Sequence, residues 1–177
     1  LVSQGLPANR VFHIGNFVPD PRRYSDADRS ERRRDLRLPD GCRVLFALGR
    51  LIEKKGCADL LAALARLPTA IDGRPSVMLI AGSGEEGGRL AQQARELGVA
   101  DRVRWLGWQD PADPWYDLAD LVIVPSRHEP LGNVILEAWN HRRAVVSTQS
   151  DGALELIRHG ENGILVPCQA PAALADA

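Results

Sequence analysis

Short, mostly apolar runs recur along this chain, each separated from the next by a longer stretch that contains polar residues. They cover residues 43–48, 76–81, 103–106, 121–124 and 144–148, with further runs at 11–15 and from Ile164 to Val166. Apolar runs of four to six residues are typical of strands that are buried on both faces of a parallel sheet. The pattern therefore predicts a sheet of parallel strands.

Helices are expected between most of these strands. After the run 43–48, leucines stand at positions 60, 61, 64 and 67, which is helical spacing, and we expect further helices at 89–97, 134–139 and 151–157. A regular alternation of strand and helix is the pattern of an α/β domain with right-handed crossovers. The predicted fold class is α/β with a mainly parallel sheet.

Composition indicates a globular chain of about one domain. Of its 177 residues, 45% are hydrophobic and 25% are charged, and the formal net charge is -1, which indicates neither disorder nor a nucleic-acid-binding surface. Cys42, Cys57 and Cys168 are odd in number and widely spread, which favours reduced thiols over a disulfide framework or a zinc site. No apolar run approaches the ~20 residues that span a bilayer. We expect a cytoplasmic protein.

Both ends of the chain look cut. It starts without an initiator Met and closes on 171–177, a helix start with no end signal. We expect residues 1–24 to form an interdomain segment with a first strand at 11–15. Residues 25–177 are expected to form one domain, truncated at both ends, whose partner domain is missing.

Two interpretations are open for the first helix, which Ser25 is expected to cap. Asp26-Ala27-Asp28 matches the Asp-x-Asp of a metal site, but acids directly after a Ser cap complement the helix dipole, and we favour the cap. The helix also carries a run of arginines, at positions 29, 32, 33, 34 and 37. A solvated helix face is the preferred interpretation of this run, and peripheral contact with an anionic membrane surface is the alternative.

The segment 127–138 contains the strongest candidate site. Glu129 and Glu137 stand eight positions apart, one in a loop and one on the following helix, whose first free N–H groups are those of Leu131, Gly132 and Asn133. Such a helix start binds anions, so a diphosphate fits there while the two glutamates accept hydrogen bonds from hydroxyls on either side. This arrangement predicts a nucleotide-sugar site. The alternative is a loop charge and a solvated helix residue.

Two cations are expected at the same edge of the sheet. The run 121–124 leads into the glutamate loop, and the run 43–48 leads into Gly49 and Arg50, with Lys55 near the start of the next helix. Ligands of open α/β sheets bind at the carboxyl ends of the strands. Arg50 and Lys55 can therefore converge on one anion, although both can also be surface cations.

A formal Gly-x-Gly-x-x-Gly stands at 82–87, between a strand and a helix. It resembles the dinucleotide fingerprint, but that fingerprint belongs to the first βα unit, and Glu85 and Glu86 would repel a pyrophosphate at this turn. We interpret the match as a decoy. It nevertheless supports the main alternative function, a nicotinamide-dependent oxidoreductase domain.

An ordered set of short motifs resembles a known family. The set is Gly49-Arg50, Lys55-Gly56, Gly82-x-Gly84, Val103 to Gly107, Ala119-Asp120, Pro125-Ser126, Glu129 to Ala138, Glu155 and Asn162-Gly163. It is similar to the donor-binding, C-terminal half of a retaining, family 4 glycosyltransferase of the two-Rossmann-domain (GT-B) class. The resemblance covers residues 16–167. It implies a Rossmann-like three-layer sandwich that forms one half of a GT-B fold.

The resemblance also implies roles for the site residues. Arg50 and Lys55 would neutralise the donor's diphosphate, Glu129 would bind hydroxyls of the transferred sugar, and Glu137 would bind the ribose. Arg50, Lys55 and Glu129 are thus the catalytic candidates. The implied donor-binding residues are Gly49, Arg50, Lys55, Gly107, Glu129, Leu131, Gly132, Asn133 and Glu137. Two cations and helix N–H groups stabilise charge that develops on a leaving phosphate, so no metal or other cofactor is implied besides a UDP- or GDP-linked sugar donor.

The implied activity is transfer of a sugar, with retention, to a glycan or lipid-linked acceptor in bacterial cell-surface polysaccharide or lipopolysaccharide synthesis. It places the protein in the cytoplasm or peripherally at the inner membrane face. The acceptor half would lie in the missing N-terminal domain, so we expect the fragment to bind donor at most. A non-catalytic nucleotide- or sugar-binding module is a further alternative.

Three positions depart from the family's pattern. Arg142 stands where a Gly commonly follows the motif helix, and Ala144 stands where a Pro precedes the next strand. Asp151 replaces the first of two glycines before the following helix. We therefore expect a differently shaped helix end and an altered loop beside the donor.

Overall fold

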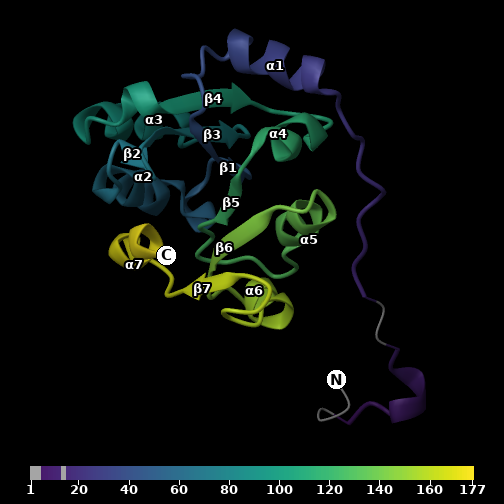
Figure 1. Ribbon diagram of the computed structural model, residues 1–177. Helices are drawn as coiled ribbons and strands as arrows, with labels where there is room; N and C mark the ends of the chain where they lie inside the picture. The colour runs from purple at the N-terminus through teal and green to yellow at the C-terminus, as the bar shows by residue number, and fades with distance from the viewer. Residues whose placement is uncertain (1–4, 13–14) are drawn as a thin grey trace.

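The computed structural model describes residues 5–12 and 15–177 (Figure 1). Its strands are β1 (Arg43–Leu48), β2 (Ala70–Ile71), β3 (Arg74–Ala81), β4 (Val103–Gly107), β5 (Leu121–Val124), β6 (Ala144–Thr148) and β7 (Ile164–Val166). Its α-helices are α1 (Asp26–Asp35), α2 (Cys57–Arg66), α3 (Gly87–Glu96), α4 (Asp113–Leu118), α5 (Asn133–Asn140), α6 (Asp151–Leu156) and α7 (Pro171–Asp176). Three 3-10 turns are η2 (Ala8–Arg10), η3 (Glu53–Lys55) and η4 (Ala100–Arg102). Within the described ranges, no helix has the length and apolar character needed to cross a membrane.

The strands form one sheet, in which β4, β3, β1, β5, β6 and β7 lie side by side and are all parallel. This confirms the predicted parallel sheet. The direction in which successive strands are added reverses between β1 and β5, as in the doubly wound dinucleotide-binding fold. That reversal opens a crevice at the carboxyl ends of β1 and β5. The short antiparallel pairing of β2 with the start of β3 was not predicted.

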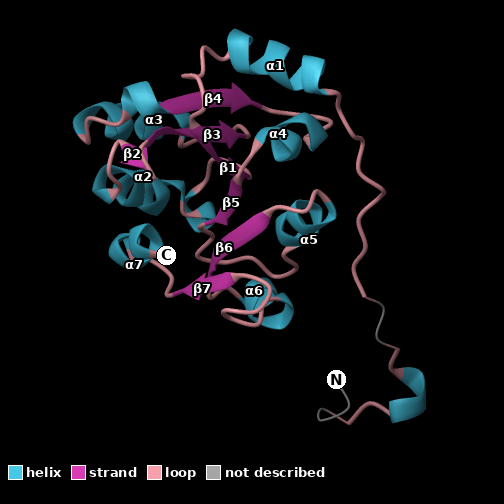
Figure 2. Cartoon of the chain, viewed as in Figure 1, coloured by secondary structure: helices cyan, strands magenta, loops and turns pink. Residues whose placement is uncertain are grey.

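Helices cover both faces of the sheet (Figure 2). One buried cluster joins α2, α3 and α7 to strand residues such as Leu45 and Ala47. The other joins α4, α5 and α6 to the alternate residues, such as Val44 and Phe46. Because successive side chains of a strand point to opposite faces, a strand without polar positions fills both clusters. The three-layer sandwich is therefore confirmed.

The capping interpretation of the first helix is confirmed. The Ser25 hydroxyl accepts the Asp28 backbone N–H at 3.2 Å, and the Asp28 carboxylate accepts the Ser25 backbone N–H at 2.9 Å, which is a capping box. The Ser25 hydrogen bonds hold the pKa of Asp28 below its ordinary value. Asp26 forms an ion pair with Arg29. Both acids thus serve the helix start.

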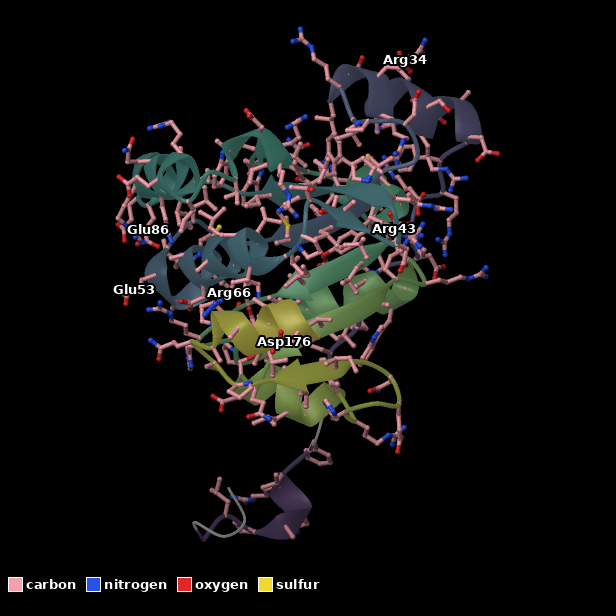
Figure 3. All side chains as sticks on the ribbon, turned by 60° about the vertical axis from the view of Figure 1, so that its left-hand side comes forward. Arg34, Arg43, Glu53, Arg66, Glu86 and Asp176 are labelled. Carbon is pink, nitrogen blue, oxygen red and sulfur yellow. The ribbon has the colours of Figure 1, made fainter. Side chains whose placement is uncertain are left out.

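Three of the five arginines of this segment interact with the chain itself. Besides Arg29, Arg32 stacks over the Tyr24 ring at 4.7 Å, and Arg33 donates to the Cys42 carbonyl at 3.3 Å. Arg34 is exposed at the outer side of α1, as Figure 3 shows. The remaining basic surface is therefore smaller than the arginine run suggests.

The predicted strand at 11–15 is absent as far as the structure describes it. Val11, Phe12 and Gly15 belong to no strand, and residues 13 and 14 lie outside the described residues. Further on, the segment 16–24 follows the α4–α5 side of the domain without regular structure. It is attached there by hydrogen bonds, for example from Asn140 to the Pro19 carbonyl at 2.7 Å. Its partners are therefore helix ends and side chains, and not a neighbouring strand.

The helix end at Arg142 keeps the usual geometry at a cost in strain. Arg142 follows α5 with φ +58°, a left-handed conformation in which a side chain is disfavoured by about 1–2 kcal/mol. Its N–H donates to the Trp139 carbonyl at 2.8 Å, and the next N–H, of Arg143, donates to the Ala138 carbonyl at 2.9 Å. This is the pattern by which a glycine usually ends a helix. The expected change in shape at this helix end was wrong.

We expect Arg142→Gly to stabilise the protein by about 1 kcal/mol, because glycine adopts the left-handed conformation without strain. The melting temperature should rise by about 2–4 °C, as measured by thermal unfolding. Arg142→Ala is the control, since it removes the guanidinium but keeps the Cβ. Equal melting temperatures for the glycine and alanine variants would show that the backbone is not strained.

Candidate functional site

The crevice between the carboxyl ends of β1 and β5 opens into a cavity of about 410 Å³. It is lined by Leu48, Gly49, Arg50, Lys54, Lys55, Gly82, Trp108, Gln109, His128, Glu129, Pro130 and Val134. The structure thus brings together the predicted residues that follow β1 and the predicted glutamate that follows β5. These residues are far apart in the sequence and meet only because β1 and β5 are neighbours in the sheet.

Lys55 and Glu129 form an ion pair inside this cavity. Their side chains are 22% and 12% exposed, so water screens the pair only weakly. Arg50 lines the same cavity, is exposed, and has no ion-pair or hydrogen-bond partner for its side chain among the described residues. The cavity therefore presents one carboxylate, Glu129, which is paired with Lys55, and two further cations, Arg50 and Lys54.

The glutamate loop packs tightly between two glycines. Gly56 has φ +68°, and a Cβ at this position would lie 1.9 Å from the Pro125 carbonyl oxygen. On the other side, Gly152 donates its N–H to the Glu129 carbonyl at 2.7 Å. This hydrogen bond joins the start of α6, where Asp151 replaces the usual glycine, to the glutamate loop; whether the loop is altered relative to the family stays a prediction.

The start of α5 lies beside the same loop. Gly132, with φ +70°, is the residue that precedes the helix. The backbone N–H groups of Leu131, Gly132 and Asn133 donate to no other residue in the described part of the chain. They are the unpaired donors that the sequence predicted at this helix start. None of the three residues lines the cavity itself; its neighbours Pro130 and Val134 do.

Glu137 belongs to a second, adjacent cavity of about 630 Å³. Its carboxylate accepts the hydroxyl of Tyr116 at 2.6 Å. Tyr116 is buried, and burial together with the Glu137 charge raises the pKa of its hydroxyl well above the ordinary value, so it stays a donor. Glu137 is therefore held in place, which argues against a merely solvated helix residue. Leu48, Trp108 and Gln109 line both cavities and connect them into one cleft.

Several residues of this cleft were not predicted. Trp108 is 71% exposed between the two cavities, and the segment 18–22 forms part of the wall near Glu137. The position of Trp108 directly after β4 was an available signal, because strand ends meet at the same edge of a parallel sheet. The segment 18–22 offered none. Gly107 lines neither cavity; its carbonyl accepts the Gly82 N–H at 2.7 Å.

In the glycine-rich turn after β3, Gly82 lines the cavity, whereas Gly84 packs against another loop of the protein. A Cβ at Gly84 would lie 2.3 Å from the Leu51 carbonyl oxygen. That same carbonyl accepts the Glu86 N–H at 3.0 Å, and the Glu86 carboxylate pairs with Arg89. The close approach that these glycines permit is thus between two loops of the chain. This supports the interpretation of the match as a decoy.

Comparison with known proteins decides the family. The family model described as glycosyl transferases group 1 matches residues 42–177. The chain belongs to the glycosyl transferases group 1 family. A lipopolysaccharide core biosynthesis glycosyltransferase, LpsE of Rhizobium meliloti, is 42% identical over 134 residues, which are 76% of this chain and 38% of LpsE. This membership goes against the nicotinamide-dependent oxidoreductase alternative.

Solved structures, among them one of a glycosyl transferase group 1 family protein, have the same fold. Alr3699/HepE from Anabaena, solved in complex with UDP-glucose, superimposes with a TM-score of 0.76 at 33% identity, over 86% of this chain and 42% of that one. The C-terminal domain of LpcC, a group 1 protein from Francisella tularensis, has a TM-score of 0.71 at 23% identity, over 84% and 78% of the two chains. This chain therefore has the fold of one half of a GT-B enzyme. It spans about two fifths of the length of LpsE and HepE.

Proposed function

We propose that this domain binds the nucleoside diphosphate sugar donor of a retaining, family 4 glycosyltransferase. The enzyme transfers the sugar to a glycan or lipid-linked acceptor in bacterial cell-surface polysaccharide or lipopolysaccharide synthesis. The names of LpsE and of the HepE complex with UDP-glucose support the class of acceptor and a UDP-linked donor. Acceptor recognition belongs, in this proposal, to a second domain of the same enzyme.

One observation carries the proposal. Glu129 and Glu137 stand in adjacent parts of a single cleft, and Arg50, Lys54 and Lys55 line the end that holds Glu129. Glu129, beside Lys55 and Arg50, suits the sugar next to the diphosphate, and Glu137 suits the ribose beyond it. A nucleotide-sugar has hydroxyls on both sides of a diphosphate, so its chemistry follows the same order along the cleft.

The mechanism uses charge that appears only during the reaction. As the glycosidic bond to the diphosphate breaks, negative charge grows on the leaving phosphate and positive charge grows on the sugar. The negative charge on the leaving phosphate is stabilised by Arg50, Lys55 and the N–H groups at the start of α5. The positive charge on the sugar is stabilised by the Glu129 carboxylate. Such contacts are stronger in the transition state than in the ground state, and they raise turnover.

Arg50→Ala and Lys55→Ala test the anion site. Each should weaken UDP binding by about tenfold or more, because a charge-assisted contact to phosphate contributes roughly 1.5–3 kcal/mol. Isothermal titration with UDP gives the Kd, and circular dichroism checks folding. Arg66→Ala, on the last turn of α2, is a control for loss of one positive charge. UDP affinities equal to that of the parent in both variants would refute the assignment.

Two further measurements separate the proposal from its alternatives. Titration with a reduced dinucleotide should show no binding where UDP binds. A full-length enzyme, assayed with donor and acceptor, should transfer sugar, whereas a non-catalytic module would bind without turnover. We place the enzyme in the cytoplasm or at the inner face of the membrane, where nucleotide-sugars are expected.

A further inference from the structure

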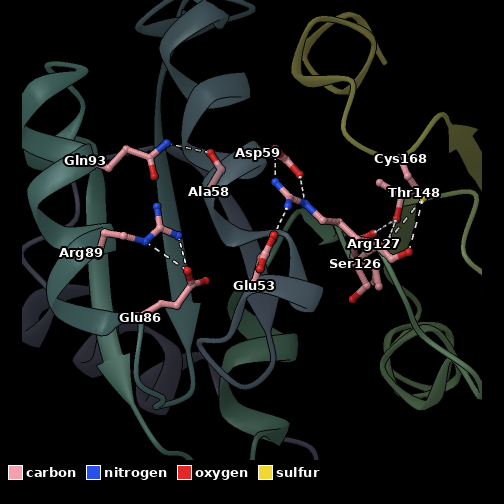
Figure 4. Close-up of polar contacts among 11 residues, drawn as sticks. Glu53, Ala58, Asp59, Glu86, Arg89, Gln93, Ser126, Arg127, Thr148 and Cys168 are labelled. Carbon is pink, nitrogen blue, oxygen red and sulfur yellow. Dashed lines mark hydrogen bonds and ion pairs between the residues drawn. The ribbon is translucent and has the colours of Figure 1, made fainter.

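The guanidinium of Arg127 lies between two acids on the segment that carries Lys55 (Figure 4). It donates from Nε and NH2 to the two oxygens of Asp59, at 2.9 and 3.1 Å, and from NH1 to Glu53 at 2.9 Å. The Asp59 side chain is only 15% exposed, and its hydrogen bonds raise the pKa of the guanidinium. A bidentate arginine–carboxylate pair of this kind fixes the orientation of the guanidinium as well as its distance from Asp59.

These contacts connect the two segments that supply the ion pair of the cavity. Arg127 is two residues before Glu129, Glu53 is two residues before Lys55, and Asp59 follows on α2. The backbone adds to the connection, because the N–H groups of Arg127 and His128 both donate to the Lys54 carbonyl, at 2.9 and 3.2 Å. The separation between Lys55 and Glu129 therefore depends on the position of Arg127.

The opposite side of the loop is held by β6 and the segment after β7. The Thr148 hydroxyl donates to the carbonyls of Val124 and Ser126, and the Cys168 thiol lies 3.8 Å from the Ser126 carbonyl (Figure 4). The backbone of the loop is thus fixed to the sheet. Within the described residues, its side-chain links to the Lys55 segment are the guanidinium of Arg127 and the Lys55–Glu129 ion pair itself.

Arg127 does not itself face the donor cavity. It lines a separate hollow of about 330 Å³ on the outer side of the loop, with Glu53, Ala58, Glu86 and Arg89. Figure 3 shows Glu53 and Glu86 at that same edge of the molecule. Three of its donor nitrogens are already bound by carboxylates. A role through its neighbours is therefore more consistent with the geometry than contact with a ligand.

We propose that Arg127, through Asp59 and Glu53, is a positioning residue that sets the distance between Lys55 and Glu129 and thereby the affinity for the donor's diphosphate. This inference rests on the proposed function of the cavity. In this inference Arg127 makes no contact with the donor. The effect of Arg127 on binding must therefore disappear when Lys55 is absent.

A double-mutant cycle tests this dependence. UDP is titrated into the parent, Arg127→Gln, Lys55→Ala and the double variant. Arg127→Gln should weaken UDP binding by about tenfold in the parent and by less than about twofold in the Lys55→Ala background, since residues that act as a unit are not additive. Arg89→Gln is the matched control. It removes an ion-paired arginine from the same hollow without touching the loop, and it should leave the Kd unchanged.

The outcomes distinguish the inference from the function on which it rests. Unchanged UDP binding in both Lys55→Ala and Arg50→Ala overturns both. Unchanged binding in Lys55→Ala alone overturns only the role of Arg127, which acts through Lys55. A loss in Lys55→Ala together with unchanged binding in a folded Arg127→Gln overturns only the role of Arg127. An equal loss from Arg127→Gln in both backgrounds also overturns it, because the residue would then act on folding or on the ligand directly. Asp59→Asn, which keeps the shape of its side chain, gives the same test with a smaller expected loss if Arg127→Gln fails to fold.

Discussion

Glu137→Gln should weaken binding of UDP and of a UDP-sugar alike, whereas Glu129→Gln should weaken only the UDP-sugar. A carboxylate that accepts hydrogen bonds from hydroxyls contributes about 1.5–3 kcal/mol, so each affected affinity should fall by about ten- to a hundredfold. If Glu137 binds the ribose as proposed, its loss should affect every ligand with a ribose. If Glu129 binds the sugar, its loss should affect only ligands that carry the sugar. Isothermal titration with both ligands measures the difference.

The geometry makes glutamine a suitable replacement at both positions. At Glu137 the amide oxygen still accepts the Tyr116 hydroxyl, so the helix should stay in place. At Glu129 the change frees Lys55 from its ion pair, which leaves the cation available for phosphate. In the full-length enzyme, Glu129→Gln should lower turnover by about a hundredfold, since contacts to the developing positive charge are lost. Equal losses of UDP affinity in both variants would show that Glu129 is not on the sugar side.

Gly56→Ala should destabilise the protein strongly, because the added methyl would overlap the Pro125 carbonyl in a left-handed backbone. The left-handed backbone costs about 1–2 kcal/mol, and the overlap with the Pro125 carbonyl adds about 1–3 kcal/mol. The melting temperature should fall by about 10 °C. Because the added methyl pushes the Lys55 segment away from the glutamate loop, UDP affinity should fall by about tenfold as well.

Gly41→Ala separates the cost of the left-handed backbone from the cost of the overlap with the Pro125 carbonyl. Gly41 has φ +64°, much like Gly56, but a Cβ there would meet no atom within 4 Å. It should therefore show only the backbone cost, about 1–2 kcal/mol, and no change in UDP affinity. A Gly56→Ala protein as stable as the Gly41→Ala protein would contradict the tight contact with Pro125.

Much of the fold was predictable because the core strands carry an unambiguous signal. The run 43–48 became β1 with the predicted bounds, and 121–124 and 144–148 became β5 and β6. Strands that lack polar positions can only be buried on both faces, which leaves few arrangements. At the described positions 11, 12 and 15 of the run 11–15 there is no strand, and the Phe12 side chain is exposed and covers no sheet. Residues 70–71 are too few to show any period.

The only site residues that could be predicted were those on the connections that follow strands or on the helices that come next. Arg50 and Glu129 stand on the connections that follow β1 and β5, and both connections start at the same edge of a parallel sheet, so their meeting was expected. The ion pair between Lys55 and Glu129 was not, because spacing shows that two residues share an edge but not that they touch. Tyr116 was missed for a related reason. Its hydroxyl reaches Glu137 only through the packing of α4 against α5.

Because the site lies beyond the strand ends, the residues that keep the domain folded mostly differ from those that line the cleft. The two core clusters draw on strands and on the buried faces of helices, whereas Arg50, Trp108 and Glu129 stand on connections. Replacing one of these loop side chains opens no cavity between sheet and helices. The domain can therefore acquire a preference for a different donor by changes in a few connections, while the residues that keep it folded stay the same.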